Sequence, residues 1–415
     1  MKFNFFPSKA IVVSIGLVCF AAVNIVFADI HSKDAERFQY DREGEIDNII
    51  ETYYKANNLP GISVAIIRDG RMIYRKGFGW ADIEEKRPAT AETIYNTGSV
   101  AKPIGATLAV KLEQDGRLWD GTTFTLDLDR PTSTYLTDVW NAKGPGTVSL
   151  PAFHTHTVDQ LLSHTGCVAD YPDKTIPGIA NQTTHYPTAI SAVQSIWNIG
   201  LVTKMSDAGL PENASNDDPC IMGKTWSYST PAFTFVAAVL ESATGRAIHR
   251  LLREEIFTPH GLSSMRIKYA SSTLPPDDNR ASLYDDDNKR VSPVNNSWRA
   301  LGGGMETNVV DLARFGWKVL GGEILSPEAR DNRLWRRVDT INSSPGYALG
   351  WGVTEDAGSR RIAEHPGMST GGRALLWIYR DHGLIIAVLS NRRNHPVDDV
   401  VVLAGRIGDE IFKIL

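Results

Sequence analysis

The chain has 415 residues, of which 42% are hydrophobic and 22% are charged, and this composition is that of a folded globular protein rather than a disordered one. Its 43 basic and 48 acidic residues give a formal net charge of -5, so there is no excess of positive charge to bind nucleic acid or an anionic membrane surface. The sequence shows no repeat of fixed period and no heptad pattern, which excludes solenoids and coiled coils.

The first 28 residues differ from the rest of the chain. Lys2 and Lys9 come before an uncharged apolar run over residues 10–27, and the small residue Ala28 stands just before the polar Asp29. This is the three-part pattern of an export signal. We expect cleavage after Ala28, which would place the mature protein in the periplasm or the medium without a stable membrane anchor. The alternative is an uncleaved anchor helix, because the run is about as long as the shortest membrane spans, roughly 17 residues.

Two cysteines, Cys167 and Cys220, follow the expected signal. Both lie in stretches rich in proline, aspartate and asparagine, which are typical of loops. An exported compartment permits disulfides. The sequence therefore favours a bridge between them over two free thiols without deciding the question.

Each end of the chain combines a hairpin pattern with a helix pattern. Residues 42–57 carry apolar side chains at helical spacing, and two apolar segments flank Asp69-Gly70, a strong signal for a two-residue hairpin turn. The expected strands and the C-terminal helix cover residues 61–68, 71–79, 374–379, 384–390 and 397–415. We therefore expect both ends to share one antiparallel sheet with helices packed on its faces.

The middle of the chain is mainly helical in pattern. Helices are expected over residues 101–114, 158–162, 187–204, 231–242 and 246–257. Two irregular stretches, residues 120–156 and 171–223, are longer than most loops of compact domains, which suggests that they cover a binding site. The prediction is an α/β fold of the α+β type. Its parts are a signal (residues 1–28), a discontinuous sheet domain (residues 29–98 and 290–415) and an inserted helical domain (residues 99–289).

Ser99 and Lys102 form the first candidate catalytic pair. They stand three residues apart at the start of the helix expected over residues 101–114, so their side chains point from the same face. A serine hydroxyl needs a base within hydrogen-bond reach, and a lysine desolvated at a helix N-terminus can be neutral enough to serve. The same helix start supplies a backbone N–H for a developing oxyanion. Taken alone, this spacing more often reflects a capping serine beside a solvated lysine.

Further segments, in a fixed order, give this pair its context. Tyr228 stands just before a long apolar helix, in Trp226-Ser227-Tyr228-Ser229-Thr230-Pro231, and His365-Pro366-Gly367 precedes the C-terminal strands. These segments resemble the serine β-lactamase and penicillin-binding-protein family, most nearly its class C, DD-carboxypeptidase and esterase branch. Flanking segments that share the likeness are residues 161–166, 302–307, 311–315 and 347–352. The resemblance extends from about residue 43 to the C-terminus and implies a β-lactamase/transpeptidase-like fold.

The resemblance implies a role for each matching residue. Ser99 would be the acylated nucleophile, Lys102 would share in its deprotonation, and Tyr228 would relay the proton to the leaving group and help to activate the deacylating water. The backbone N–H groups of Ser99 and Met368 would form the oxyanion hole. The expected substrate-contacting residues are Thr230, His365, Gly367 and Met368. No cofactor and no metal are implied.

Three residues depart from the usual motifs of that family. Thr230 stands where the second motif has asparagine, His365 replaces a lysine, and Pro366 replaces a threonine. A histidine of ordinary pKa is mostly neutral at pH 7, so the fixed positive charge that penicillin-hydrolysing members place near the substrate carboxylate is missing. Arg361 or Arg373 could restore it. An esterase, or a peptidase acting on D-amino-acid or peptidoglycan-type substrates, is therefore favoured over a true β-lactamase.

Other functions are less favoured but stay open. The chain could be a non-catalytic, penicillin-binding-like sensor, although the intact catalytic candidates argue against this, or it could transfer the acyl group to an acceptor other than water. His154, His156 and His164 could suggest a metal site, but no carboxylate or thiolate is grouped beside them. No Gly-x-Ser-x-Gly elbow surrounds any serine, so the α/β-hydrolase alternative lacks its nucleophile. The expected partner is a small ester, amide or peptide substrate.

Overall fold

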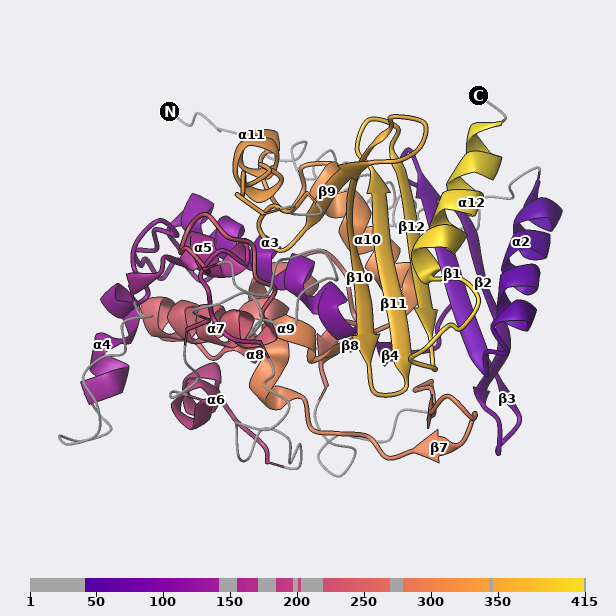
Figure 1. Cartoon of the computed structure of the whole chain (residues 1–415), viewed down its shortest axis with the longest axis horizontal. Helices are drawn as coiled ribbons and strands as arrows, with labels where there is room; N and C mark the ends of the chain where they lie inside the picture. The colour runs from indigo at the N-terminus through magenta and orange to yellow at the C-terminus, as the bar shows by residue number, and fades with distance from the viewer. Residues whose placement is uncertain are drawn as a thin grey trace, which may run out of the picture.

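The computed structural model of the protein describes residues 42–141, 155–170, 184–196, 201–202, 219–268, 279–342 and 346–413. The expected export signal lies outside these residues. Both ends of the chain contribute strands to one seven-stranded antiparallel sheet, as predicted (Figure 1). Its strands, in spatial order, are β3 (Arg87–Pro88), β2 (Arg71–Asp82), β1 (Gly61–Arg68), β12 (Leu384–Ser390), β11 (Gly372–Tyr379), β10 (Arg361–Ser369) and β9 (Gly352–Glu355).

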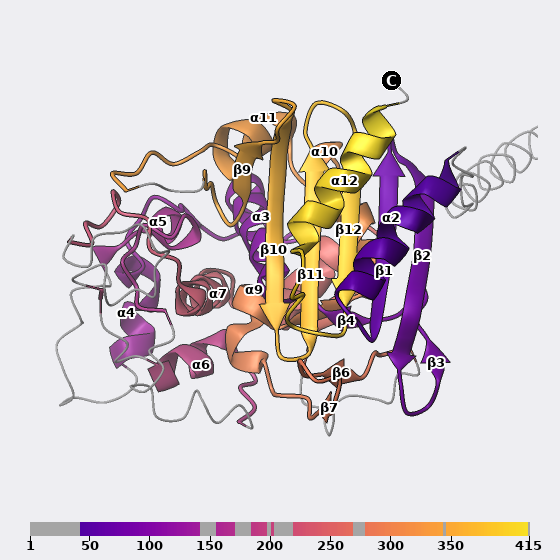
Figure 2. The ribbon, with the colours of Figure 1, turned by 45° about the vertical axis from the view of Figure 1, so that its right-hand side comes forward.

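Strand β1 joins the two chain ends, because it pairs with β2 on one side and with β12 on the other. Its side chains alternate between the two faces of the sheet. Val64 and Ile66 belong to a core shared with α2 (Glu43–Ala56) and α12 (Val400–Phe412), whereas Ala65 and Ile67 belong to the larger core that includes α10 (Val309–Leu320). Figure 2 shows α2 and α12 together on one face of the sheet and α10 behind it.

The hairpin between β1 and β2 turns at Asp69-Gly70, as the sequence predicts. Both residues have positive φ, +48° and +80°, as a two-residue turn of type I′ requires. Asparagine and aspartate tolerate this conformation better than most residues, and glycine adopts it at no steric cost. The turn sets the pairing of β1 with β2, and the core pattern on β1 then sets its pairing with β12.

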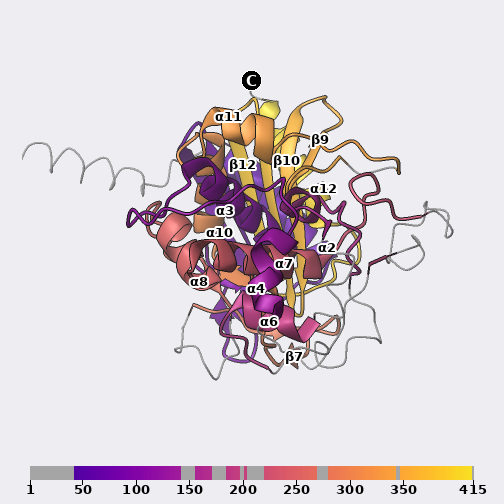
Figure 3. The same cartoon turned by 90° about the vertical axis from the view of Figure 1, so that its left-hand side faces the viewer.

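A largely helical part packs beside the sheet (Figure 3). Its helix α3 (Ala101–Asp115) is buried along its first ten residues, because it contacts β10 on one side and α7 (Thr230–Thr244) on another. The other helices of the described residues are α4 (Ser133–Asn141), α5 (Val158–Leu162), α6 (Ala189–Ile196), α8 (Ile248–Leu251), α9 (Ala300–Gly303) and α11 (Pro327–Ala329). Short helical turns are η1 (Gly98–Val100), η4 (Leu252–Phe257), η5 (Ser297–Arg299) and η6 (Arg330–Leu334). None of the helices in the described ranges has the length and apolarity needed to cross a bilayer.

Two predictions for the helical part are wrong in detail. The helix expected over residues 187–204 ends at Ile196 within the described ranges, since Leu201 instead forms a β-bridge with Val168. The stretch over residues 120–156, expected to be irregular, contains α4, which packs against α7. Most of the second long stretch, residues 171–223, lies outside the described residues, so its expected role in covering a site stays a prediction.

A small three-stranded sheet fixes the position of the segment that precedes Ser99. Its strands are β4 (Tyr95–Asn96), β8 (Met305–Thr307) and β5 (Arg266–Ile267), and two further short strands, β6 (Leu283–Tyr284) and β7 (Arg290–Val291), pair nearby. Glu306 accepts hydrogen bonds from Arg266 and Arg280 at 2.6 and 2.8 Å. The Lys268 ammonium group donates to Asn96 at 2.6 Å. Because these polar groups are paired inside the protein, they hold β4 firmly against its neighbours.

Candidate active site

Ser99 lies in the short turn η1, between β4 and the buried helix α3. The chain changes direction at Gly98, whose φ is +50°. A Cβ atom at Gly98 would lie only 2.6 Å from the Met368 backbone nitrogen of strand β10, and one at Gly367 would lie 2.0 Å from the Thr97 carbonyl oxygen. The two glycines therefore let the backbone before Ser99 contact strand β10 directly.

Lys102 follows Ser99 by one helical turn and is fully buried. Its Nζ atom lies 3.1 Å from Ser99 Oγ, 3.3 Å from Thr230 Oγ1 and 2.7 Å from the carbonyl oxygen of Gly302. Three acceptors match the three protons of an ammonium group. When Nζ is neutral, it has two protons for Gly302 and Thr230 and a lone pair that can accept the Ser99 hydroxyl proton.

Burial gives Lys102 the pKa that a base needs near neutrality. The pKa of Lys102 is lowered from 10.5 to about 7, mainly by desolvation, which outweighs the opposing effect of Asp170 and is aided by Arg299. A substantial fraction of the side chain is therefore neutral at pH 7. The sequence predicted this direction from a lysine desolvated at a helix N-terminus, and burial is the largest cause in the structure.

Tyr228 lies against Lys102, whose Nζ atom is 4.5 Å from the centre of the tyrosine ring. The next residue, Ser229, is the N-cap of α7, and its side chain accepts a hydrogen bond from the Ala232 backbone at 3.1 Å. This cap explains why α7 begins directly after Tyr228, as the sequence predicts. The structure thus brings Ser99, Lys102 and Tyr228 together from η1, α3 and the segment before α7.

Thr230 occupies the second-motif position predicted from the sequence and contacts Lys102 through its hydroxyl group. Its backbone N–H donates to Asp170 at 2.9 Å, which fixes the first turn of α7. A Cβ atom at Gly302 would lie 2.7 Å from the Thr230 methyl group, so the two segments are in close contact. The threonine hydroxyl therefore makes one of the contacts that an asparagine amide would make there, namely the contact with lysine.

Both ring nitrogens of His365 are bonded to protein groups. Nδ1 lies 2.6 Å from the carbonyl oxygen of Pro366, and Nε2 lies 2.8 Å from the hydroxyl of Tyr347. A carbonyl oxygen only accepts, so Nδ1 carries the proton and Nε2 accepts the proton of Tyr347. Burial lowers the pKa of His365 to about 3, so the ring is neutral at pH 7. Contact of His365 with substrate stays a prediction.

Strand β10 runs past η1 beyond Glu364, and within the described ranges no strand pairs with it there on the edge where β9 lies. Strand β9 pairs with β10 only from Arg361 to Glu364. Beyond that point, Pro366 is compatible with an unpaired strand edge because it lacks a backbone N–H. The side chain of Met368 is 43% exposed although its backbone contacts Gly98. Gly367 and Met368 are thus beside Ser99, where the sequence predicted them.

Comparison with known proteins agrees with this arrangement. A family model described as Beta-lactamase matches residues 46–406. The chain belongs to the beta-lactamase family. Among its relatives is penicillin-binding protein 4* of Bacillus subtilis (strain 168), which is 22% identical over 372 residues covering 86% of this chain and 74% of the relative.

Solved structures of other proteins share the fold of this chain. The D-amino acid amidase of Ochrobactrum anthropi SV3, in complex with D-phenylalanine, has a TM-score of 0.68 at 18% identity and covers 89% of this chain and 100% of its own. EstCE1, described as a hydrolase with promiscuous acyltransferase activity, has a TM-score of 0.64 at 17% identity, with 84% and 93% covered. Members of the family are mostly serine hydrolases.

Several groups that line this beta-lactamase-family site were not predicted from the sequence to be catalytic or to contact substrate. Gly302 contributes a backbone carbonyl to Lys102, Asp170 holds Thr230, and Tyr347 bonds to His365. His164 packs on Tyr228 with ring centres 4.3 Å apart. Most of these residues lie in segments that resemble the family, and that resemblance is the sequence signal that could have identified them.

The two described histidines among those considered for a metal site have different hydrogen-bond partners. His156 Nδ1 lies 3.2 Å from the Thr132 hydroxyl, His164 Nδ1 accepts the Ser229 backbone N–H, and His154 lies outside the described residues. In the described ranges no group of three or more potential ligands is gathered at one point.

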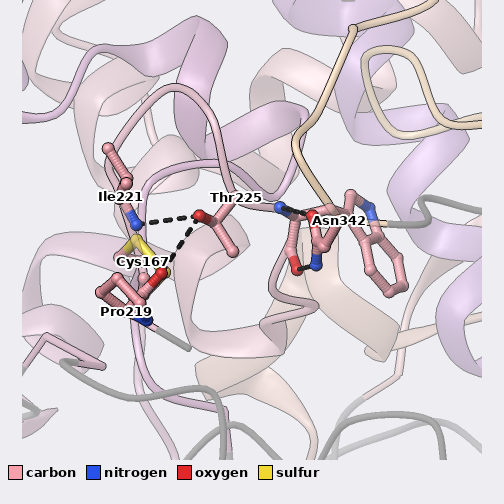
Figure 4. The surroundings of a disulfide bond; sticks show 7 residues. Cys167, Pro219, Ile221, Thr225 and Asn342 are labelled. Atoms are coloured by element: carbon pink, nitrogen blue, oxygen red, sulfur yellow. Dashed lines mark hydrogen bonds between the residues drawn. A yellow bond between two sulfur atoms is a disulfide. The ribbon is translucent and has the colours of Figure 1, made fainter. Parts of the chain in front are cut away.

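A disulfide ties the segment before Tyr228 to the loop after α5. Cys167 and Cys220 are bonded, with Cα atoms 6.0 Å apart, so the bridge that the sequence favoured is present. Figure 4 shows the Thr225 hydroxyl bonded to the backbone next to this bridge and the Asn342 amide facing the same segment. The Asn342 amide pairs with both backbone groups of Trp226 at 2.8 Å. The chain is therefore fixed at several points in the eight residues before Tyr228.

Loss of this bridge should weaken the fold only under oxidising conditions. Replacing Cys167 with serine is expected to lower the free energy of unfolding by roughly 2–4 kcal/mol, because the reduced loop regains conformational freedom when unfolded. Thermal unfolding of the wild type and of Cys167→Ser, each with and without reductant, measures this. Cys220→Ser should behave in the same way. A loss of equal size in reductant would show that the cysteine stabilises the fold by packing rather than by the bridge.

Proposed function

We propose that the protein is a serine hydrolase that cleaves an ester or amide bond through an acyl-enzyme on Ser99. The observation that carries this proposal is that the buried Lys102 Nζ atom lies 3.1 Å from Ser99 Oγ. The same atom also donates hydrogen bonds to Thr230 Oγ1 and to the Gly302 carbonyl oxygen. Burial lowers the pKa of Lys102 to about 7, so the amine can accept the serine proton at neutral pH.

Each step of acyl transfer has a matching group in this site. Ser99 Oγ attacks the carbonyl carbon as its proton passes to Lys102, and the carbonyl oxygen becomes an anion near the backbone N–H groups of Ser99 and Met368. Tyr228 passes its proton to the leaving alcohol or amine as the bond to that group breaks, and takes up in return the proton that Lys102 received from Ser99. A water molecule then attacks the acyl carbon while Tyr228 and Lys102 accept its proton, the bond to Ser99 Oγ breaks, and that proton returns to Oγ, which releases the acid and free Ser99.

The histidine and the two arginines considered as replacements for the third-motif lysine are either neutral or already paired. His365 is neutral, and both its nitrogens are bonded to protein groups. Arg361 is paired with Asp381, and Arg373 with Asp399, so both arginines that the sequence suggested as replacements for the missing lysine charge already have a carboxylate partner. We therefore favour an esterase, or a peptidase or amidase for D-amino-acid or peptidoglycan-type substrates, over a β-lactamase.

Labelling of Ser99 tests this function. Purified protein is treated with a fluorophosphonate probe or, separately, with a fluorescent penicillin, and the adduct is mapped by mass spectrometry. We expect the fluorophosphonate to label Ser99 and the penicillin to label it weakly or not at all, with no adduct in Ser99→Ala. Equal labelling by both probes would support a penicillin-recognising enzyme. Absence of any adduct at Ser99 would support the non-catalytic sensor.

We also propose that the protein is exported. The disulfide between Cys167 and Cys220 supports this proposal, because such bonds persist in oxidising compartments. N-terminal sequencing of the protein purified from its source tests it, and a mature terminus at Asp29 is the expected result.

A further inference from the structure

One residue holds the backbone on both sides of Tyr228. The carbonyl oxygen of His164 accepts the backbone N–H of Ser227 at 2.7 Å. Its ring nitrogen Nδ1 accepts the backbone N–H of Ser229 at 3.1 Å. Because the two bonds come from the same residue, the short segment from Ser227 to Ser229 is clamped at both ends, and Tyr228 is the residue between them.

The ring of His164 also packs on the ring of Tyr228. Their centres are 4.3 Å apart, and the ring of Tyr347 lies 5.1 Å from the same imidazole. His164 is almost completely buried, and burial lowers its pKa well below 6.5, so the ring is neutral. Because Nδ1 accepts the Ser229 N–H, Nδ1 carries no proton. These contacts restrict the rotation of the Tyr228 side chain as well as the position of its backbone.

The backbone of His164 is in a conformation that few histidines adopt. Its φ is +59°, in the left-handed region, which is unfavourable for a residue with a side chain. Such strain persists only where surrounding contacts enforce it. Here the left-handed turn brings both the carbonyl and the ring of one residue to face the same segment of chain.

We propose that His164 is the positioning residue of Tyr228 and holds its hydroxyl where it can exchange protons with the leaving group and the attacking water. This inference rests on the proposed function. The inference predicts that His164 acts only through Tyr228. The contacts that its carbonyl oxygen, Nδ1 and ring make here are with Ser227, Ser229 and Tyr228 rather than with Ser99.

Two substitutions separate positioning from folding. Glycine adopts φ of +59° without strain, so His164→Gly keeps the turn while removing the ring and its acceptor. Asparagine also tolerates this conformation, and its Oδ1 atom occupies nearly the place of Nδ1, so His164→Asn keeps an acceptor for the Ser229 N–H. The exposed Ser359, with φ of +58°, lies in the turn between β9 and β10, at the end of β10 opposite to Met368, so Ser359→Gly is a matched control that relieves the same strain there.

The experiment compares kcat and KM for a p-nitrophenyl ester in these variants, with and without Tyr228→Phe, and the melting temperature of each. We expect His164→Gly to lower kcat about 30-fold with little change in KM, His164→Asn to recover most of that loss, and Ser359→Gly to match the wild type. In the Tyr228→Phe background, His164→Gly should lower kcat by less than about twofold, because the group that it positions is already gone.

Two results would overturn the inference while leaving the hydrolase function intact. The first is a His164→Gly enzyme with wild-type kcat. The second is a loss of the same size with and without the Tyr228 hydroxyl, which would show that His164 supports the fold in general. A wild-type protein that neither hydrolyses the ester nor labels at Ser99 would overturn both proposals together, so the two failures are distinguishable.

Discussion

Replacing Lys102 with methionine is expected to lower the rate of Ser99 acylation by about 10³-fold, within the range that a positioned general base contributes. Methionine fills most of the buried volume but offers no lone pair to the Ser99 hydroxyl. The rate of fluorophosphonate labelling at pH 7.5 measures the effect. Labelling of Lys102→Met at the wild-type rate would contradict the assignment of Lys102 as the base.

The pH dependence of acylation provides an independent test of the same group. Lys102 acts as a base only in its neutral form, and burial lowers its pKa to about 7. The acylation rate should therefore rise with pH up to about 7 and level off above it. In Lys102→Met this inflection should be absent, because the group that titrates has been removed.

A second buried lysine gives the matched control for this substitution. Lys268 is 2% exposed, its pKa is also lowered, to about 8, and its Nζ atom bonds to Asn96 rather than to Ser99. Lys268→Met should cost stability and keep the inflection near pH 7 in the acylation rate. If both variants lost the inflection, the pH dependence would report a general change in the fold.

The parts of the site that could be predicted from the sequence are those set by local spacing. Ser99 and Lys102 are one helical turn apart, so a helix start was enough to bring them together. The hairpin at Asp69-Gly70 was predicted for a similar reason, since two neighbouring residues with the right conformational preferences define it. Family likeness added Tyr228 and the strand edge near Met368, which are distant in sequence.

The contacts that depend on tertiary packing could not be predicted in this way. The bond between Tyr347 and His365 exists because strand β9 returns the chain beside β10, and no residue spacing encodes that approach. The Gly302 carbonyl is a backbone group, which a motif of side chains does not reveal. The sequence indicated that Lys102 is desolvated at a helix start, but its complete burial depends on the packing of α7 and its neighbours against α3, which no local pattern reveals. The overlong helix expected over residues 187–204 has the same origin, because a bridge to Val168 overrides local preference.

Replacing Gly98 with alanine is expected to reduce acylation by about 10²–10³-fold, which is the usual cost of losing one oxyanion-hole donor. The added Cβ atom would lie 2.6 Å from the backbone nitrogen of Met368, a distance that real Cβ contacts do not reach. Strand β10 must then move away from η1, and the Met368 N–H moves away from the carbonyl oxygen that it is proposed to bind. Labelling of Ser99 by the fluorophosphonate probe and hydrolysis of a p-nitrophenyl ester both measure this loss.

Gly116 separates the effect of this contact from the effect of backbone strain. Its φ of +59° is close to the +50° of Gly98, but nothing lies within 4 Å of a Cβ atom placed there. Gly116→Ala therefore introduces only the strain of a left-handed alanine, roughly 1–2 kcal/mol, and should keep wild-type acylation at a slightly lower melting temperature. If Gly98→Ala were to acylate as fast as Gly116→Ala, strand β10 would not supply a donor to the oxyanion, and stabilisation of that charge would have to come from η1 and α3 alone.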